Sequence, residues 1–237
     1  MKFVTVAGPP SSGKTAVLMH TIKHMLRDEI RVVVAKIDCL ETNDGEKYHR
    51  LGIPVLVGLS GDICPDHFYV SNLEEVFNWA KGKGARIAFL ETAGLCHRCA
   101  PAIKGCLAIS VVDNLSGIDV PQKIGPMLTT ADVVVITKGD LVSQAEREVF
   151  RHKVQSLNPA AQVLEVNGLT GKGSLALKKI LAQAPEIDRI TGRELRSSMP
   201  ACVCSYCTGE TKIGASFQLG HVIKLDVTET QGGGEIT

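Results

Sequence analysis

The sequence of 237 residues predicts an α/β fold, in which helices cover a doubly wound, mostly parallel sheet. Two observations predict this fold class. Short runs rich in β-branched residues recur along the chain, and most are continuously apolar, as in strands that are buried on both faces. Helical patterns alternate with these runs, which is the order typical of α/β folds. Because ligands of such folds bind at the carboxyl ends of the strands, we expect functional residues there.

Seven segments carry the strand pattern, and four carry helical signals. One helix begins at Lys14 and has apolar side chains along one face. Residues 71–74 and 143–146 have the Ser-x-x-Glu pattern of a capping box, which begins a helix, and residues 173–182 supply a further helix. The predicted strands are residues 3–7, 31–37, 54–58, 86–90, 107–112, 133–136 and 162–166. The apolar face of the first helix carries Leu18, Ile22, Met25 and Leu26.

The regular alternation stops near Pro185. From there to Pro200 the chain is polar, which predicts a connector. A cysteine-rich stretch follows, and the alternating residues 212–227 predict a small hairpin around Leu219 and Gly220. We therefore divide the chain into an α/β domain, residues 1–185, and a connector with a small Cys-containing C-terminal extension, residues 186–237.

Composition and charge narrow the function. Hydrophobic residues make up 44% of the chain and charged residues 22%, as in ordinary globular proteins. The formal charge of +1 gives no case for nucleic-acid binding through bulk charge. No apolar run reaches the ~18 residues that span a bilayer, and the stretch before Gly8 is too short for a signal peptide. We expect a soluble, cytoplasmic protein with no nucleic-acid or membrane partner.

Residues 8–15 match the phosphate-binding pattern G-x-x-x-x-G-K-[ST] in full, between a predicted strand and a predicted helix. The glycines allow backbone N–H groups to point inward, and the helix N-terminus adds its positive end. Lys14 would contact the β- and γ-phosphates, and the Thr15 hydroxyl would bind Mg²⁺. The predicted nucleotide-binding residues of this loop are Gly8, Pro9, Ser11, Ser12, Gly13, Lys14, Thr15 and Ala16.

Acidic residues follow two other predicted strands. Asp38 could reach Mg²⁺ directly or through water, and Glu91 precedes a turn of small residues whose Gly94 would let the backbone approach a γ-phosphate. Lys14, Asp38 and Glu91 are the predicted catalytic residues, and Thr15 with Asp38 the predicted Mg²⁺ ligands. Positioning and charge stabilisation would carry the rate of hydrolysis, since phosphoryl transfer to water needs little covalent help.

The last two strand ends predict a guanine site. Residues 137–140 are Thr137-Lys138-Gly139-Asp140, in which Asp140 could accept guanine N1–H and N2–H while the Lys138 stem covers the base. Asn167 and Gly168 follow the next strand, where guanine-binding folds place a second base-contacting loop. GTP is therefore predicted in preference to ATP.

With these motifs in chain order, residues 3–181 resemble the metal-handling P-loop GTPases of the SIMIBI class, especially the urease accessory (UreG) and hydrogenase nickel-insertion (HypB) GTPases. The more specific stretches are the phosphate-binding loop, residues 91–94 and residues 118–141, with Thr137 in place of the asparagine of N-K-x-D. The resemblance implies that residues 1–185 are a P-loop GTPase domain. It also implies a nucleotide-gated homodimer that works with accessory proteins and delivers a metal ion, usually nickel, to a client metalloenzyme.

The resemblance further implies a transition-metal site. Cys64 and His67, in Cys64-Pro65-Asp66-His67, resemble the family's Cys-His element with one residue inserted. The turn after Glu91 resembles the position of a further cysteine in the hydrogenase relative, and here it holds Cys96, His97 and Cys99.

The spacing of the eight cysteines independently indicates metal ligands. Cys96, His97, Cys99 and Cys106 offer three thiolates and an imidazole, and Cys202, Cys204 and Cys207 offer three thiolates without an obvious fourth ligand. Such soft ligands favour zinc, nickel, copper(I) or an iron–sulfur cluster. The C-terminal set could also be a structural zinc knuckle, or a cluster that bridges two subunits. Cys39 is better explained as a small buried hydrophobe.

Two functions are compatible with these motifs. The first is a GTP-hydrolysing metallochaperone whose nucleotide state controls metal binding. The alternative is an ATP-dependent iron–sulfur redox protein, or a cofactor-loading protein, with a cluster that bridges two subunits.

Overall fold

The computed structural model describes residues 1–94, 102–197, 211–218 and 222–227. All seven predicted strands are confirmed, and they form one sheet in the order β3-β2-β4-β1-β5-β6-β7. Every neighbouring pair is parallel. The strands are β1 (Lys2–Ala7), β2 (Val32–Asp38), β3 (Val55–Leu59), β4 (Ile87–Glu91), β5 (Leu107–Asp113), β6 (Val133–Thr137) and β7 (Gln162–Glu165).

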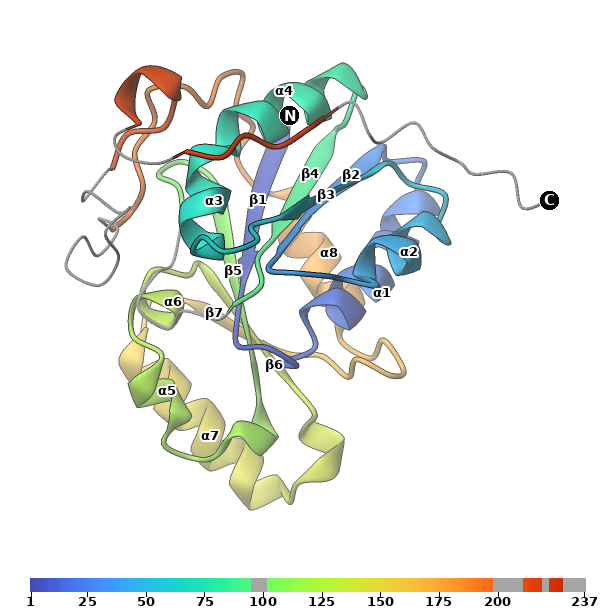
Figure 1. Ribbon diagram of the computed structural model, residues 1–237. Coiled ribbons are helices and arrows are strands. Elements are labelled where there is room, and N and C mark those ends of the chain that lie inside the picture. Colours follow the sequence, from blue (N-terminus) through green and yellow to red (C-terminus); the bar gives the residue numbers. More distant parts are fainter. Residues whose placement is uncertain (95–101, 198–210, 219–221, 228–237) are drawn as a thin grey trace.

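Helices cover both faces of the sheet, so the doubly wound architecture is confirmed (Figure 1). One face packs against α1, α2 and α8, and the other against α3 to α7. Successive residues of β1 point to opposite faces, with Phe3 in one apolar cluster and Val4 in the other. The helices are α1 (Lys14–Leu26), α2 (Asp44–His49), α3 (Pro65–Ser71), α4 (Leu73–Gly82), α5 (Val120–Lys123), α6 (Pro126–Thr129), α7 (Gln144–Leu157) and α8 (Ser174–Ala182).

The helix starts test the capping predictions. The helices at Lys14 and at residues 173–182 are confirmed, and so is the capping box at 143–146, in which both reciprocal hydrogen bonds are present. The predicted helix start at 71–74 is also confirmed, since α4 begins at Leu73, but the capping box there is wrong. The Ser71 hydroxyl donates to the carbonyl of His67 within α3, while the Glu74 carboxylate accepts from the Thr191 hydroxyl and the Ala215 amide. A neighbouring carbonyl of α3 and two distant residues thus take the groups that the cap would have used.

The described residues of 212–227 do not form the strands of the predicted hairpin. They have only an isolated bridge at Lys212 and a short 3₁₀ turn, Ala215–Phe217; the predicted tip, Leu219 and Gly220, lies outside the described residues. A buried Asn72 holds the rest of the segment, because its amide donates to Ile223 O (2.9 Å) and accepts from Leu225 N (2.7 Å).

The described part of the C-terminal region packs on the sheet domain. It lies beside α3 and α4 (Figure 1), and its apolar side chains join the cluster that contains Phe3. The division at residue 185 stays a prediction. No helix of the described residues is long and apolar enough to cross a membrane. The buried side chains of this region are Ile187, Ile190, Leu195, Ile213 and Leu225.

Candidate nucleotide-binding site

The loop between β1 and α1 has the backbone of a phosphate cradle. Gly8 lies so close to β5 that a Cβ there would be 2.1 Å from Val111 O, and Gly13 has φ +94° at the first turn of α1. The Lys14 ammonium lies inside the loop and donates to Gly8 O and Pro9 O, both at 2.9 Å. Burial lowers the pKa of Lys14 to about 8. A bound anion would favour the charged ammonium, as the nearby carboxylates do.

Glu91 lies at the centre of a buried polar network at the end of β4. One of its oxygens is 2.8 Å from the Thr15 hydroxyl and 2.9 Å from the Lys36 ammonium. The other accepts from the Tyr48 hydroxyl at 2.6 Å. With both oxygens occupied and the side chain fully buried, Glu91 is suited to orienting Thr15 and a cation rather than to removing a proton from water.

Asp44, the first residue of α2, completes this network. Its Oδ2 lies 2.9 Å from the Thr15 hydroxyl and 3.2 Å from the Lys36 ammonium. Asp38 is more distant, 3.6 Å from that ammonium, and also accepts from Cys39 N. The sequence analysis missed Lys36, Asp44 and Tyr48. A lysine within the apolar strand 31–37 was the available signal, since buried lysines are almost always paired.

These residues surround an open pocket of about 400 Å³ at the carboxyl ends of the strands. The Thr15 hydroxyl and the carboxylates of Asp44 and Glu91 are oxygen ligands of the kind that Mg²⁺ prefers, so the residues fit this ion, with phosphate oxygens completing its shell. The pocket brings together seven of the predicted residues: Ser11, Gly13, Lys14, Thr15, Ala16, Asp38 and Glu91. It adds Pro10, Lys36, Asp44, Lys47 and Ala93.

The turn after β4 lies directly against the phosphate loop. Gly94 has φ +76°, and a Cβ at this position would be 1.7 Å from Gly8 O and 3.1 Å from the Lys14 ammonium. Only glycine permits this approach. This contact places Gly94 beside the Lys14 ammonium, at the phosphate end of the pocket.

Thr137 supports the phosphate loop from the end of β6. Its hydroxyl donates to Ser12 O at 2.6 Å, and its own carbonyl accepts from Asn114 Nδ2 at 2.8 Å. The threonine thus braces the phosphate loop. Lys138 follows with φ 55° and lies 3.4 Å from Asp113, while Asp140 is exposed.

The loop at residues 167–171 lies on the other side of the start of α1. The Asn167 side chain accepts from Leu169 N and Thr170 N, both at 2.9 Å, so it shapes its own loop. A Cβ on Gly168 would be 3.3 Å from the Ala16 side chain, and the Gly168 carbonyl is 3.1 Å from a ring nitrogen of His20. This loop therefore borders α1, and Thr137, at the start of the other predicted base-contacting loop, borders the phosphate loop.

The predicted transition-metal residues are only partly described. Cys64 precedes α3, and His67 is buried within it. Cys106 is buried, and burial raises the pKa of its thiol to about 11, which favours the neutral form. No three His, Cys, Asp or Glu side chains of the described residues converge as ligands of one metal ion. The remaining predicted ligands, Cys96, His97, Cys99, Cys202, Cys204 and Cys207, lie outside the described residues, so the metal ligands stay predictions.

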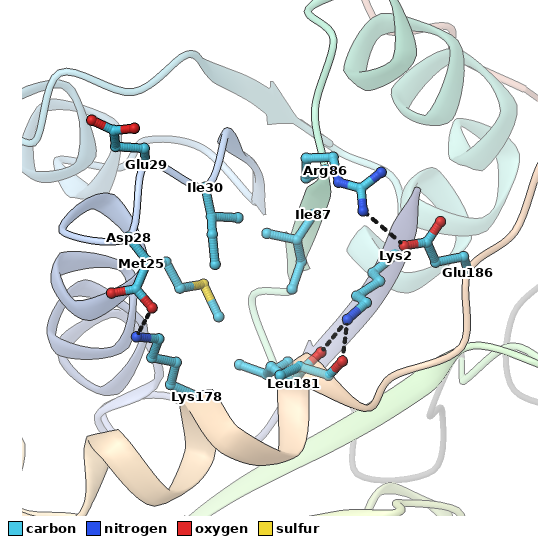
Figure 2. A pocket seen from close by; sticks show the side chains of 11 residues that line it. Lys2, Met25, Asp28, Glu29, Ile30, Arg86, Ile87, Lys178, Leu181 and Glu186 are labelled. Carbon is cyan, nitrogen blue, oxygen red and sulfur yellow. Dashed lines mark hydrogen bonds and ion pairs between the residues drawn. The ribbon is translucent and has the colours of Figure 1, made fainter.

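A second pocket, of about 350 Å³, lies at the amino ends of β1 and β4 (Figure 2). Four of its charged side chains are already paired with one another: Lys178 with Asp28, and Arg86 with Glu186 at 3.4 Å. Lys2 donates to carbonyls at the end of α8. Because α1 and α8 present their carboxyl ends here, their dipoles disfavour phosphate, and the nucleotide is assigned to the loop before α1.

The parallel sheet, the phosphate loop and the carboxylates at neighbouring strand ends together define a P-loop nucleoside triphosphatase of the SIMIBI class. The family model described as "CobW/HypB/UreG, nucleotide-binding domain" matches residues 2–165. The chain therefore belongs to the CobW/HypB/UreG family.

Individual relatives agree with this assignment. An uncharacterized protein of Methanocaldococcus jannaschii is 51% identical over 95% of this chain and 97% of its own length. Urease accessory protein UreG 2 of Methylorubrum populi is 26% identical over 84% of this chain and all of its own. The crystal structure of HypB from Helicobacter pylori in complex with nickel has a TM-score of 0.64 at 20% identity, covering 77% of this chain and 86% of that one, and supports the fold.

Proposed function

We propose that this protein is a GTP-hydrolysing metallochaperone that acts in the cytoplasm as a homodimer and delivers a metal ion, nickel in the first instance, to a client metalloenzyme or its accessory proteins. The observation that carries the nucleotide half is the pocket in which Lys14, Thr15, Asp44 and Glu91 meet. The family, and its UreG and HypB members, support the metal half.

In this proposal the triphosphate replaces the loop carbonyls as the partner of Lys14. The ammonium would neutralise charge that develops between the β- and γ-phosphates, while Mg²⁺, held by Thr15 with Asp38 and Glu91 nearby, would polarise the same oxygens. Asp140 and Lys138 would select guanine, and the loop at Asn167 and Gly168 would flank the base. Hydrolysis by water would then release inorganic phosphate and leave GDP.

The described backbone supports one thiolate site built from both cysteine-rich segments. Ile103 and Leu195 form an antiparallel bridge. Beside it, Arg196 N donates to Ala102 O (2.7 Å) and Lys104 N donates to Glu194 O (2.9 Å). Ala102 directly follows residues 95–101, and Arg196 comes two residues before 198–210. Since the pairing is antiparallel, both segments leave this bridge at the same end.

The far end of the second segment returns to the same bridge. Leu195 N donates to Thr211 O at 2.7 Å, and Lys212 pairs with Glu194. The Arg196 guanidinium fixes the arrangement, because it donates to Cys106 O (2.6 Å) and to the Asp132 carboxylate (2.7 Å and 2.8 Å). The described residues that flank the two cysteine-rich segments are thus held beside one another.

Within these segments, Cys96 with Cys99 and Cys204 with Cys207 have the C-x-x-C spacing with which two thiolates hold one metal ion. Cys99 lies three residues before Ala102, and Cys207 lies four before Thr211. A chain that extends by about 3.5 Å per residue lets both thiols reach a common point. We propose these four thiolates as ligands of one nickel or zinc ion, with His97, Cys106 and Cys202 as neighbours and Cys64 with His67 as the separate, family-type element.

Metal analysis of anaerobically purified protein tests this function. At this four-thiolate site we expect one equivalent of nickel or zinc per chain, and we expect Cys99→Ser and Cys207→Ser each to lose it, because a tetrahedral site that loses one of its four thiolates holds its ion far more weakly. Cys39→Ser, which changes a thiol at the end of β2, is the matched control and should retain the metal. A non-hydrolysable GTP analogue should change metal affinity about tenfold relative to GDP, a usual coupling for two linked sites.

Full metal content in both Cys99→Ser and Cys207→Ser would contradict the shared site, and identical metal affinity with GTP analogue and GDP would contradict the switch. Purified protein that contains iron and absorbs at ~400 nm would instead favour the alternative function, an ATP-dependent redox or cofactor-loading protein with a bridging cluster.

A further inference from the structure

We infer that Lys36 is an internal counter-ion of the phosphate pocket, which lets the protein bind nucleotide without Mg²⁺ and which Mg²⁺ must displace from its carboxylate partners. The inference rests on the nucleotide site proposed above. Lys36 lies on β2, outside the phosphate loop, and it would control the order in which nucleotide and Mg²⁺ bind.

Lys36 lies on a strand of the sheet and not on a surface loop. It pairs in register with Glu91 on β4 and with Val57 on β3, near the carboxyl end of a strand that has neighbours on both sides. Its side chain is 4% exposed. A lysine so deeply buried must have its charge compensated nearby, since an unpaired buried ammonium is strongly unfavourable.

The compensation comes from the carboxylates that surround the phosphate pocket. The ammonium lies 2.9 Å from Glu91 Oε1, 3.2 Å from Asp44 Oδ2 and 3.6 Å from Asp38 Oδ2. Lys14, in contrast, donates to carbonyls of its own loop and stays available for phosphate. The two buried lysines of the pocket therefore have different partners and different roles.

The Thr15 hydroxyl contacts the same two oxygens as Lys36. It lies 2.8 Å from Glu91 Oε1 and 2.9 Å from Asp44 Oδ2. A Mg²⁺ ion bound to Thr15 would therefore compete with the Lys36 ammonium for Glu91 and Asp44. Two cations cannot share these oxygens at full strength, because they repel each other at such short separations.

The charge of the pocket shows why Lys36 matters before Mg²⁺ arrives. Lys14, Lys36 and Lys47 line it, as do Asp38, Asp44 and Glu91, so the formal charges of these six side chains cancel. Without Lys36 the carboxylates would be in excess and would oppose a triphosphate. Mg²⁺ would remove that opposition, so the effect of Lys36 should depend on whether the ion is present.

Nucleotide titration of the full chain, with EDTA and with saturating Mg²⁺, tests the inference. Wild type should bind GTP in both conditions. Lys36→Met should bind GTP about 30-fold more weakly than wild type in EDTA, but within about threefold in Mg²⁺, because loss of one unit charge a few ångströms from the phosphates is compensated only by the ion. Lys36→Arg should behave as wild type. Lys23→Met is the matched control: it removes an exposed lysine of α1 that does not line the pocket, so GTP affinity should be unchanged in both conditions.

Three results would decide against the inference. An equal loss in EDTA and in Mg²⁺ for Lys36→Met would show a merely structural role, and a wild type that binds GTP only with Mg²⁺ would show that Lys36 does not substitute for the ion. If Lys36→Met does not fold, the double variant Lys36→Met with Asp44→Asn takes its place, because it also removes one of the carboxylates left unpaired. If this double variant folds but does not bind GTP in EDTA, the inference is overturned. A wild type that binds no nucleotide under either condition would instead refute the proposed function itself.

Discussion

Replacing Lys14 with alanine is expected to weaken GTP binding by at least about 100-fold, the size of effect seen when one partner of a buried charge pair is truncated. The ammonium is buried at the bottom of the phosphate loop, where it donates to the carbonyls of Gly8 and Pro9. No other lysine of the described pocket is bonded to that loop, so no neighbour can take its place. Isothermal titration calorimetry with GTP and Mg²⁺ measures the loss.

The control for this variant is Lys23→Ala, which removes an exposed lysine from the same helix and should leave GTP affinity unchanged. The metal content of folded Lys14→Ala should also be unchanged, because the proposed thiolate site is built on a different part of the chain. GTP binding within about threefold of wild type would contradict the assigned role of Lys14, and equal loss of metal and nucleotide would contradict the separation of the two sites.

Replacing Gly94 with alanine is expected to cost about 3 kcal/mol or more of unfolding free energy, because strain in the left-handed backbone region adds to a collision that a packed structure cannot absorb. The new Cβ would be 1.7 Å from Gly8 O, so the turn after β4 and the phosphate loop could no longer touch. In a chain of this size that cost lowers the melting temperature by roughly 10 °C. Remaining folded protein should bind GTP weakly, since the loop must shift.

Gly52→Ala separates the two causes. Gly52 also has a positive φ, +72°, but a Cβ there would meet nothing within 4 Å. We expect this control to cost about 1 kcal/mol, which is the backbone strain alone, and to leave GTP affinity intact. Equal melting temperatures for the two variants in thermal unfolding would show that the contact between Gly94 and Gly8 is not as tight as the structure has it.

The fold was predictable because its signals are local. Each strand is a short apolar run, and the phosphate loop is a contiguous motif with a strand before it and a helix after it. Parallel strands place their carboxyl ends at one edge, so Asp38 and Glu91 could be assigned to the pocket before the structure was known. The same reasoning assigned Thr137 to this edge of the sheet, as part of the predicted guanine site, but it did not predict the hydrogen bond from its hydroxyl to Ser12 O.

What the sequence did not predict depends on contacts between distant residues. Asp44 joins the pocket, and Tyr48 the buried network around Glu91, only because α2 folds back over β2, which no local pattern encodes. The failed cap at residues 71–74 has the same cause, since Glu74 is bound by groups more than 100 positions away. The side-chain amide of Asn72 likewise fixes the backbone at Ile223 and Leu225, although the alternating sequence pattern of this segment predicts a strand.

Calorimetric titration of the wild-type chain with GTP and with ATP, each with Mg²⁺, tests the central claim most directly. The account predicts a single site per chain, with GTP bound at least about tenfold more tightly than ATP, because only guanine offers Asp140 two N–H donors. Absence of heat with either nucleotide, for protein shown to be folded, would contradict the claim that the loop before α1 holds a triphosphate.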